Sequence, residues 1–167
     1  MKSSYQLRSW QEYDAESLAH HANNFKIARY MTDQFPYPYT LVNARTFIQM
    51  AMQHTPARIL AIEVDGNAVG GIGIHLQQDV MRKNAELGYW LSEAYWGRGI
   101  MTEAVKEMVD YAFAHFDIIR VYARPYGNNK ASQRVLEKAG FVLEAHIKGN
   151  IIKNDEMLDE LIYAVRK

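Results

Sequence analysis

The stretch GYWLSEAYWGRGIMTE, residues 88–103, joins the end of a β-rich run to the start of a long amphipathic segment. In that segment, residues 100–116, apolar side chains recur at the spacing of one helix face, which predicts a long helix. The connecting turn contains Gly97, Arg98 and Gly99. The first amides of a helix have no intrahelical acceptor and lie at the positive end of its dipole, and glycine lets a ligand approach the backbone. The stretch therefore predicts an anion-binding turn; the alternative is that the glycines only turn the chain sharply.

Two familiar phosphate-binding motifs do not fit this turn. A P-loop requires Gly-x-x-x-x-Gly-Lys-Ser/Thr, which occurs nowhere in the chain, so nucleotide triphosphate hydrolysis loses its main support. A dinucleotide-binding fingerprint requires a third glycine where Thr102 stands. A second glycine pair, Gly71 and Gly73, lies inside a β-rich run and opens no helix, so it indicates a bulge or a close backbone approach.

Working outward from the turn, changes in hydrophobic period divide the whole chain into strands and helices. The tripeptide Asp65-Gly66-Asn67 separates two β-rich runs and is typical of a hairpin turn with positive φ. Two prolines make residues 35–39 an aromatic-rich loop, and residues 149–155 are expected to connect a closing antiparallel pair. The expected strands cover residues 5–10, 58–64, 68–76, 85–91, 118–123, 141–148 and 157–165, and the expected helices cover residues 14–21, 25–31, 41–54, 100–116 and 129–139.

The order of these elements predicts an α/β (α+β) fold. We expect a central, mixed and mostly antiparallel sheet of about seven strands, with helices on both faces. The chain has 167 residues, of which 49% are hydrophobic and 23% charged, as in one ordinary globular domain. Since no internal repeat or Gly/Ser linker interrupts it, the expected domain spans residues 1–167.

Charge and cysteine content narrow the class of function. Lys plus Arg number 19 and Asp plus Glu number 19, so the long-range field that generic binding to nucleic acid or an anionic membrane requires is missing. Neither partner is expected. No apolar run approaches the roughly 18 residues of a membrane span, and residues 1–30 resemble no targeting segment, so a cytoplasmic location is expected. The absence of cysteine excludes disulfides. A monomer and a homodimer both stay open.

Three linked motifs carry a family resemblance. They are AELGYWL at residues 85–91, YWGRGIMTEA at residues 95–104 and NKASQRVLEKAGF at residues 129–141. In this order they resemble the GNAT superfamily of N-acetyltransferases, and most of all the branch that contains the ribosomal-protein N-terminal acetyltransferases. The order of elements along the whole chain also fits that fold, while the specific matches concentrate in residues 85–141.

The resemblance implies acetyl-coenzyme A as the acetyl donor. Its pyrophosphate would lie on the backbone amides of residues 96–101 with Arg98 nearby, and its pantetheine would pair with the strand that ends at Leu91. This chain departs from the family pattern at Trp96, where the superfamily has glutamine or arginine, and at Met101, where it has a small residue. The cofactor-binding residues that the resemblance implies are Trp90, Leu91, Trp96, Gly97, Arg98, Gly99, Ile100, Met101, Thr102 and Asn129.

Glu86 and Ser132 are the candidate catalytic residues. Acetyl transfer requires a neutral amine and a proton for the leaving thiolate. Glu86 lies on the central strand and is the candidate general base, acting directly or through a water molecule; a structural salt bridge or cross-strand pair is the alternative. In many members of the superfamily a tyrosine protonates the thiolate, but Leu136 stands at that position. The ribosomal-protein branch has a serine one turn earlier, as Ser132 is here, and helix capping is the alternative role for it.

The acceptor is expected to be a primary amine. A peptide α-amine with a pKa near 8 is roughly a quarter neutral in the cell, whereas a lysine with a pKa near 10.4 costs about 4 kcal/mol to deprotonate. A single modest base therefore suits the N-terminal α-amine of a protein, and the family resemblance implies a ribosomal protein as the acceptor. Phe35, Tyr37 and Tyr39, together with residues 150–155, are the candidate acceptor-binding elements, unless the aromatic rings only cover the core.

We therefore expect an acetyl-CoA-dependent N-acetyltransferase that works by direct attack in a ternary complex, because no cysteine exists to carry an acetyl group. One alternative is a small-molecule amine acetyltransferase, with a polyamine or an antibiotic as acceptor. The other is a non-catalytic acyl-CoA-binding module. The six histidines form no His-Glu-x-x-His motif or carboxylate cluster, so no metal is expected.

Overall fold

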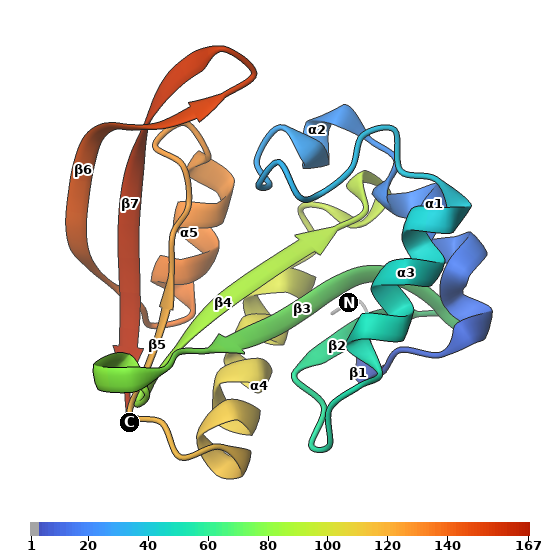
Figure 1. The fold of residues 1–167 in the computed structure, drawn as a ribbon, viewed down its shortest axis with the longest axis horizontal. Coiled ribbons are helices and arrows are strands. Elements are labelled where there is room, and N and C mark those ends of the chain that lie inside the picture. The colour runs from blue at the N-terminus through green and yellow to red at the C-terminus, as the bar shows by residue number, and fades with distance from the viewer. Residues whose placement is uncertain (1–3) are drawn as a thin grey trace. The chain divides into compact units, whose positions relative to one another are not determined.

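A computed structural model describes residues 4–167 and has the predicted α/β architecture (Figure 1). Hydrogen-bonded strands follow the order β1-β2-β3-β4-β5-β7-β6 in a seven-stranded sheet, which confirms the predicted mixed, mostly antiparallel sheet. The strands are β1 (Gln6–Ser9), β2 (Ile59–Val64), β3 (Asn67–Leu76), β4 (Asn84–Leu91), β5 (Arg120–Ala123), β6 (Val142–Lys153) and β7 (Glu156–Arg166). The helices are α1 (Ala15–Ala22), α2 (Phe25–Ala28), α3 (Leu41–Ala51), α4 (Ile100–His115) and α5 (Lys130–Lys138).

The chain packs into two compact units. The first comprises the chain up to Gly73 together with Tyr89–Ala104, and the second comprises Ile74–Gly88 and Val105–Lys167. Each unit therefore consists of segments that are distant in the sequence. The predicted anion-binding turn belongs to the first unit, whereas Glu86 and Ser132 belong to the second.

In the first unit, the β2–β3 hairpin confirms the prediction from Asp65 and Gly66. Both residues have positive φ, 49° and 83°, and Val64 pairs directly with Asn67, as in a two-residue hairpin. The glycine-rich part of β3 provides a close approach, as its sequence indicated. A Cβ at Gly71 would lie 2.8 Å from the indole Nε1 of Trp90, so only glycine fits beside that ring.

The core of the first unit is built from α1, α3 and the strands. Trp10, Leu18 and Ile48 are almost completely buried in one cluster, and α1 and α3 lie side by side (Figure 1). Leu18 and Ile48 come from the apolar faces of α1 and α3, so burial of those faces positions both helices.

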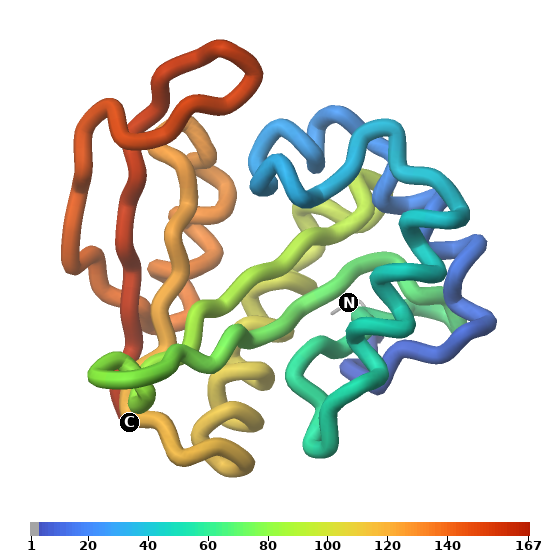
Figure 2. The backbone as a smooth tube through the Cα atoms, viewed as in Figure 1, coloured from blue at the N-terminus to red at the C-terminus, as the bar shows by residue number. Residues whose placement is uncertain are grey.

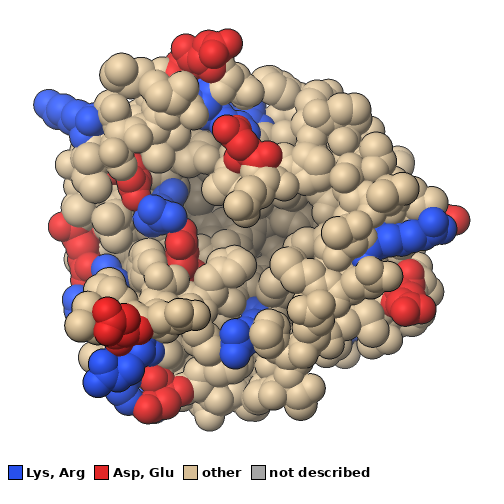
Figure 3. Space-filling view, viewed as in Figure 1, with Lys and Arg blue, Asp and Glu red and all other residues tan. Residues whose placement is uncertain are grey.

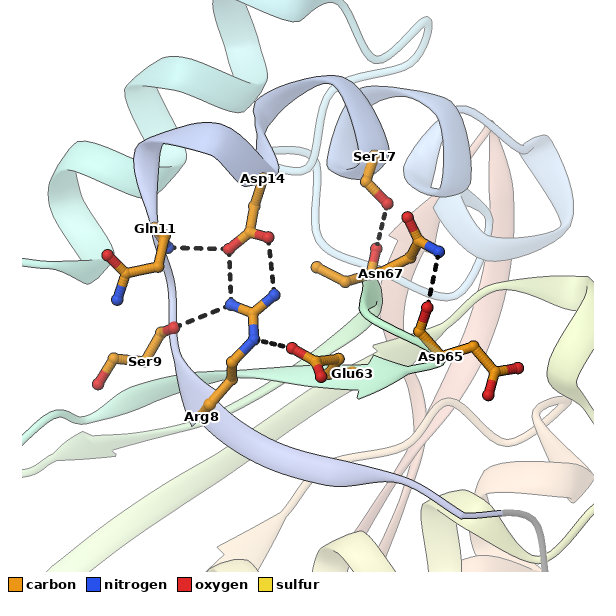
Figure 4. A network of polar contacts seen from close by, with 9 residues as sticks. Arg8, Ser9, Gln11, Asp14, Ser17, Glu63, Asp65 and Asn67 are labelled. Atoms are coloured by element: carbon orange, nitrogen blue, oxygen red, sulfur yellow. Dashed lines mark hydrogen bonds and ion pairs between the residues drawn. The ribbon is translucent and has the colours of Figure 1, made fainter.

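A buried ion-pair network lies at the edge of this unit. The Arg8 guanidinium donates to both carboxylate oxygens of Asp14 at 2.8 Å and also to Glu63 (Figure 4). The Gln11 amide donates to Asp14 Oδ2 at 2.8 Å. Asp14 is only 3% exposed, and these donors compensate for the loss of its hydration. The network ties β1 to β2 and to the start of α1.

In the second unit, β4 and β5 pair in parallel, with Glu86 opposite Tyr122, and β5 pairs antiparallel with β7. The β6–β7 hairpin corrects the prediction for residues 149–155, most of which belong to β6 rather than to a connection. Gly149, with φ of 61°, lies in a bulge, after which pairing resumes at Ile151 opposite Leu158. The actual turn is Asn154-Asp155, and both residues have positive φ. The prediction was wrong because Gly149, which lies inside β6, was interpreted as the start of the turn.

Candidate active site

The anion-binding turn has the geometry that the sequence predicts. The chain reverses between the end of β4 and the start of α4 (Figure 2). Gly97 and Gly99 adopt φ of 72° and 76°, and a Cβ added at either would meet no atom within 4 Å. The glycines are therefore needed for their backbone conformation, and the space above them is open.

The start of α4 presents free amide groups to this space. Helix α4 begins at Ile100, and the Glu103 amide makes a 3.3 Å hydrogen bond to the Gly99 carbonyl oxygen. The amides of residues 100–102 precede that bond and have no intrahelical acceptor. Ile100 and Met101 are only 2% and 8% exposed, so both residues pack into the core at the start of α4. The buried Met101 side chain fills the position where the family has a small residue.

The side chains of the turn hold the turn itself. Trp96 donates from its indole Nε1 to the Leu91 carbonyl oxygen at 2.7 Å, and its ring is 44% exposed. Arg98 donates to the Ala94 carbonyl oxygen at 2.9 Å and stacks its guanidinium 5.1 Å from the centre of the Tyr95 ring. The family's glutamine or arginine is thus replaced by a tryptophan that fastens the turn to the end of β4. Residues 96–99 are all exposed.

A short segment before the turn is anchored by the N-terminal helices. His21 Nδ1 lies 2.8 Å from the Ser92 hydroxyl, and burial together with the charge of His20 lowers the pKa of His21. Glu93 accepts hydrogen bonds from Lys26 at 2.6 Å and from Asn24 at 2.8 Å. The hydrogen bonds to Lys26 and Asn24 lower the pKa of the Glu93 carboxyl. The region of α1 and α2 therefore holds the chain that leads into the glycine turn.

The end of β4 is buried in the first unit. Trp90 and Leu91 are each 7% exposed, and the Trp90 ring lies 6.2 Å from the Phe35 ring inside the first unit. The Ser92 amide donates to the Val69 carbonyl oxygen at 2.8 Å, so the strand stays paired up to this point. Contact of Trp90 or Leu91 with a pantetheine therefore stays a prediction.

The aromatic loop divides into covering and exposed residues. Phe35 and Tyr39 pack on the core with ring centres 5.1 Å apart, and burial raises the pKa of Tyr39 to about 12. Tyr37 is 55% exposed and lies 5.7 Å from the ring of Phe25, itself 48% exposed. The core-covering alternative thus fits Phe35 and Tyr39, and Tyr37 keeps a ring available for an acceptor.

In the second unit, Glu86 has a strong partner. Arg124 donates from Nε to Glu86 Oε1 at 2.9 Å and from Nη2 to Oε2 at 3.4 Å, which joins both carboxylate oxygens to one guanidinium. The hydrogen bonds to Glu86 raise the pKa of Arg124, and burial, which acts in the opposite direction, only partly offsets this effect. The Glu86 side chain stays 25% exposed. The structural alternative for Glu86 is therefore present, and the exposed part of its carboxylate leaves the predicted role as a base open.

Glu160 and Asn150 extend this cluster; Asn150 belongs to the predicted acceptor-binding residues 150–155, whereas Arg124 and Glu160 were not singled out in the sequence. Arg124 Nη1 lies 3.3 Å from Glu160 Oε1, and Asn150 donates to Glu160 Oε2. Glu160 is 4% exposed, so it is a buried carboxylate with charged and neutral donors. In the sequence Glu160 follows Asp159 in the same strand and therefore did not stand out. Its partners are set by register, which local patterns do not reveal.

The start of α5 carries the other candidates of this unit. Asn129 is the N-cap of α5, and its Oδ1 accepts the Ser132 amide at 3.2 Å. Asn129 therefore supplies the N-cap of α5, and the role of the Ser132 hydroxyl stays a prediction. Leu136 is completely buried, so the position of the family's tyrosine belongs to the core here. Gln133 donates to the carbonyl oxygens of residues 126 and 127 at 3.2 Å and fixes the helix start.

The predicted residues thus lie in two groups. The turn at residues 96–102, the end of β4 and the aromatic loop belong to the first unit, and Glu86, Asn129 and Ser132 belong to the second. Among residues 4–167 no group of three or more His, Cys, Asp or Glu side chains could hold a metal ion. In the same range no helix is long and apolar enough to cross a membrane.

A model of the acetyltransferase (GNAT) domain matches residues 5–142. The chain therefore belongs to the GNAT acetyltransferase family, as the three motifs and the glycine turn suggested. This family membership confirms the resemblance and defines the class of protein.

Curated relatives name several acetyltransferases. "Putative ribosomal N-acetyltransferase YdaF" of Bacillus subtilis is 33% identical over 103 residues, which are 62% of this chain and 56% of YdaF. "Probable N-acetyltransferase YjcK" of the same organism is 42% identical over 83 residues, 50% of this chain and 46% of YjcK. The chain thus spans about half the length of these two relatives. Spermidine N(1)-acetyltransferase of Escherichia coli is 23% identical over 153 residues, 92% of this chain and 81% of that protein.

Solved structures share the fold over nearly the whole chain. The ribosomal L7/L12 acetyltransferase RimL in complex with coenzyme A superposes with a TM-score of 0.85 at 23% identity, covering 98% of this chain and 94% of RimL. The microcin C7 self-immunity acetyltransferase MccE in complex with acetyl-CoA and AMP superposes with a TM-score of 0.83 at 25% identity, covering 98% and 92%.

Proposed function

We propose that this protein transfers an acetyl group from acetyl-CoA to a primary amine. One observation carries the proposal: the glycine turn, with open space beside Gly97 and Gly99, leads directly into the 16-residue helix α4, whose first amides have no intrahelical acceptor. Such amides and the helix dipole bind a pyrophosphate without any cationic side chain. Membership of the GNAT family and the acetyl-CoA complex of MccE support coenzyme A as the molecule that carries it.

Acetyl transfer requires that the protein position the amine beside the thioester and provide one proton acceptor. The amine nitrogen attacks the thioester carbon, the carbon–sulfur bond breaks, and the amine proton leaves as the thiolate takes one up. We assign Glu86 to accept a proton from the acceptor, directly or through water, either from the ammonium before attack or from the neutral amine as it attacks, since its carboxylate is partly exposed. We assign Ser132, at the capped start of α5, to donate a hydrogen bond to the leaving sulfur.

For the acceptor, we propose the N-terminal α-amine of a protein. An α-amine is roughly a quarter neutral near pH 7.5, so a single partly exposed carboxylate is a sufficient base. The relative YdaF carries a ribosomal name, which supports a ribosomal protein as acceptor. The second candidate is a polyamine, because the spermidine acetyltransferase aligns with 92% of this chain.

A thiol-release assay with matched acceptors tests the proposal. Acetyl-CoA is supplied with a peptide that has a free N-terminus, with the same peptide blocked at its N-terminus but carrying a lysine, and with spermidine. We expect kcat/KM to be at least about tenfold higher for the free α-amine, as its smaller deprotonation cost predicts. Preference for spermidine would replace the protein acceptor with the polyamine. Coenzyme A binding without thiol release from any amine would leave only a binding module.

A further inference from the structure

Arg124 is held in place from its buried side. The segment that follows β5 is tied to β7, because the Leu161 amide donates to the Pro125 carbonyl oxygen at 3.0 Å and Tyr126 pairs with Glu160. The Arg124 guanidinium also pairs through Nη1 with the buried Glu160 carboxylate. A buried carboxylate requires such a partner, so this contact restrains the arginine.

The opposite edge of the guanidinium faces Glu86. Nε and Nη2 bond one oxygen each of the Glu86 carboxylate, which fixes its plane as well as its position. The planar fork of arginine is suited to two such contacts, whereas a lysine ammonium is a single point charge. The buried Glu160 carboxylate thus orients Arg124, and Arg124 in turn orients the partly exposed Glu86 carboxylate.

The sum of charges in the cluster favours a cationic acceptor. Glu86 and Glu160 contribute two negative charges and Arg124 one positive charge, while Asn150 is neutral. Tyr122 lies opposite Glu86 in the sheet, and burial, followed by the Glu86 charge, raises its pKa, so it adds no negative charge near neutral pH. Arg120 also lies 4.8 Å from the centre of the Tyr122 ring but is paired with Glu144, so the three charged groups that contact one another sum to one negative charge, which attracts an ammonium group.

We infer that Arg124, anchored by Glu160, is a positioning residue that aims the Glu86 carboxylate at the acceptor amine. The inference rests on the proposed acetyl transfer. Arg124 does not touch the reacting atoms and acts only through Glu86, so its contribution exists only while Glu86 carries a carboxylate.

A double-variant cycle tests this dependence. Turnover is measured for the wild type, Arg124→Gln, Glu86→Gln and the double variant. We expect Arg124→Gln to lower kcat on the order of tenfold when Glu86 is present and less than about twofold when residue 86 is glutamine. Arg124→Lys keeps the charge without the fork and should also lose several-fold in kcat, again only with Glu86 present.

Controls separate positioning from folding. Coenzyme A affinity and far-UV circular dichroism should match the wild type in each variant; if Arg124→Gln does not fold, the cycle is completed with Arg124→Lys. Arg166→Gln removes a different exposed arginine, one paired with Glu144, and should leave kcat unchanged in both backgrounds. Equal losses with and without Glu86, or wild-type turnover of Arg124→Lys, would overturn the inference alone. A wild type that releases no thiol with any amine would overturn the proposed function and the inference with it.

Discussion

At the scale of single residues, the structure assigns partners that the sequence left open. Glu86 could be read as a base or as half of a salt bridge, and it does have a salt-bridge partner in Arg124. The two residues are 38 positions apart. Their contact depends on the parallel register of β4 and β5, and no local pattern encodes that register. The two possible roles of Glu86 were predictable from its position on a strand, but its partner Arg124 was not.

Glu86→Gln tests the proposed base. Glutamine keeps the shape of the side chain but accepts no proton, so kcat is expected to fall about a hundredfold while coenzyme A affinity changes little. Initial rates between about pH 6 and 9 provide the measurement. Glu144→Gln, which removes a carboxylate paired with Arg120 and Arg166, is the matched control. Rates unaltered at every pH would remove Glu86 from the mechanism.

Asp14→Ala tests the buried network of Figure 4. The substitution leaves the Arg8 guanidinium, whose side chain is 15% exposed, without its two strongest acceptor contacts. We expect the free energy of unfolding to fall by about 3 kcal/mol, the cost of breaking a buried pair from one side. Urea denaturation measures it. Asp117→Ala, which removes an aspartate that is 90% exposed and bound to Lys83, should have a much smaller effect. Equal effects would mean that the network contributes no more than a surface pair.

At the scale of elements, the sequence predicted the bounds of strands and helices correctly where a glycine lies in a turn, and wrongly where it lies in a bulge. Asp65-Gly66 and Gly97-x-Gly99 were correctly predicted as turns, because positive φ is required at tight connections. Gly149 also has positive φ, yet it lies in a bulge inside β6, since a bulge makes the same demand as a turn. Glycine therefore marks the conformation and not the end of a strand.

Gly99→Ala tests the glycine turn. A Cβ at this position clashes with nothing, but alanine at φ of 76° costs about 1 to 2 kcal/mol and shifts the first amides of α4. We expect coenzyme A affinity to fall roughly tenfold, because 1.4 kcal/mol changes an equilibrium constant by that factor. Gly66→Ala introduces the same strain at φ of 83° with the same free space, in the β2–β3 turn. It should lower stability and leave the affinity intact. If both variants bind equally well, the turn does not hold the ligand.

The contact between α1 and the chain before the turn predicts a pH dependence of stability. The pKa of His21 is lowered below 6.5 in the folded state, first by burial and then by the charge of His20. Between that lowered value and 6.5 the unfolded chain binds more protons than the folded chain. The free energy of unfolding is therefore expected to decrease as the pH falls from neutral through 6.5.

Denaturant titrations at pH 7.5 and at about pH 5.5 check this sign. His21→Gln cannot titrate and should flatten the pH dependence. His54→Gln, which removes an exposed histidine after α3, should leave the dependence as in the wild type. An identical slope in His21→Gln and the wild type would contradict the assignment.

At the scale of the whole molecule, the order of strands and helices was predictable from hydrophobic period and the three motifs. The solved acetyltransferases superpose on 98% of the chain at 23% and 25% identity, which shows how little sequence the fold requires. Charged side chains of both signs are interspersed on the face seen in Figure 3, in keeping with 19 basic and 19 acidic residues. Equal numbers of basic and acidic residues give no net charge that would steer a partner, and we propose that local groups such as Tyr37 and the Arg124 cluster select the acceptor.

The most direct test of the account is calorimetric titration of the folded wild-type protein with coenzyme A. The free amides of residues 100–102 behind the glycine turn predict one site per chain with a dissociation constant in the micromolar to millimolar range, as is usual for enzyme substrates. The account also predicts that affinity falls in Gly99→Ala and not in Gly66→Ala. A folded protein with no detectable association would contradict it.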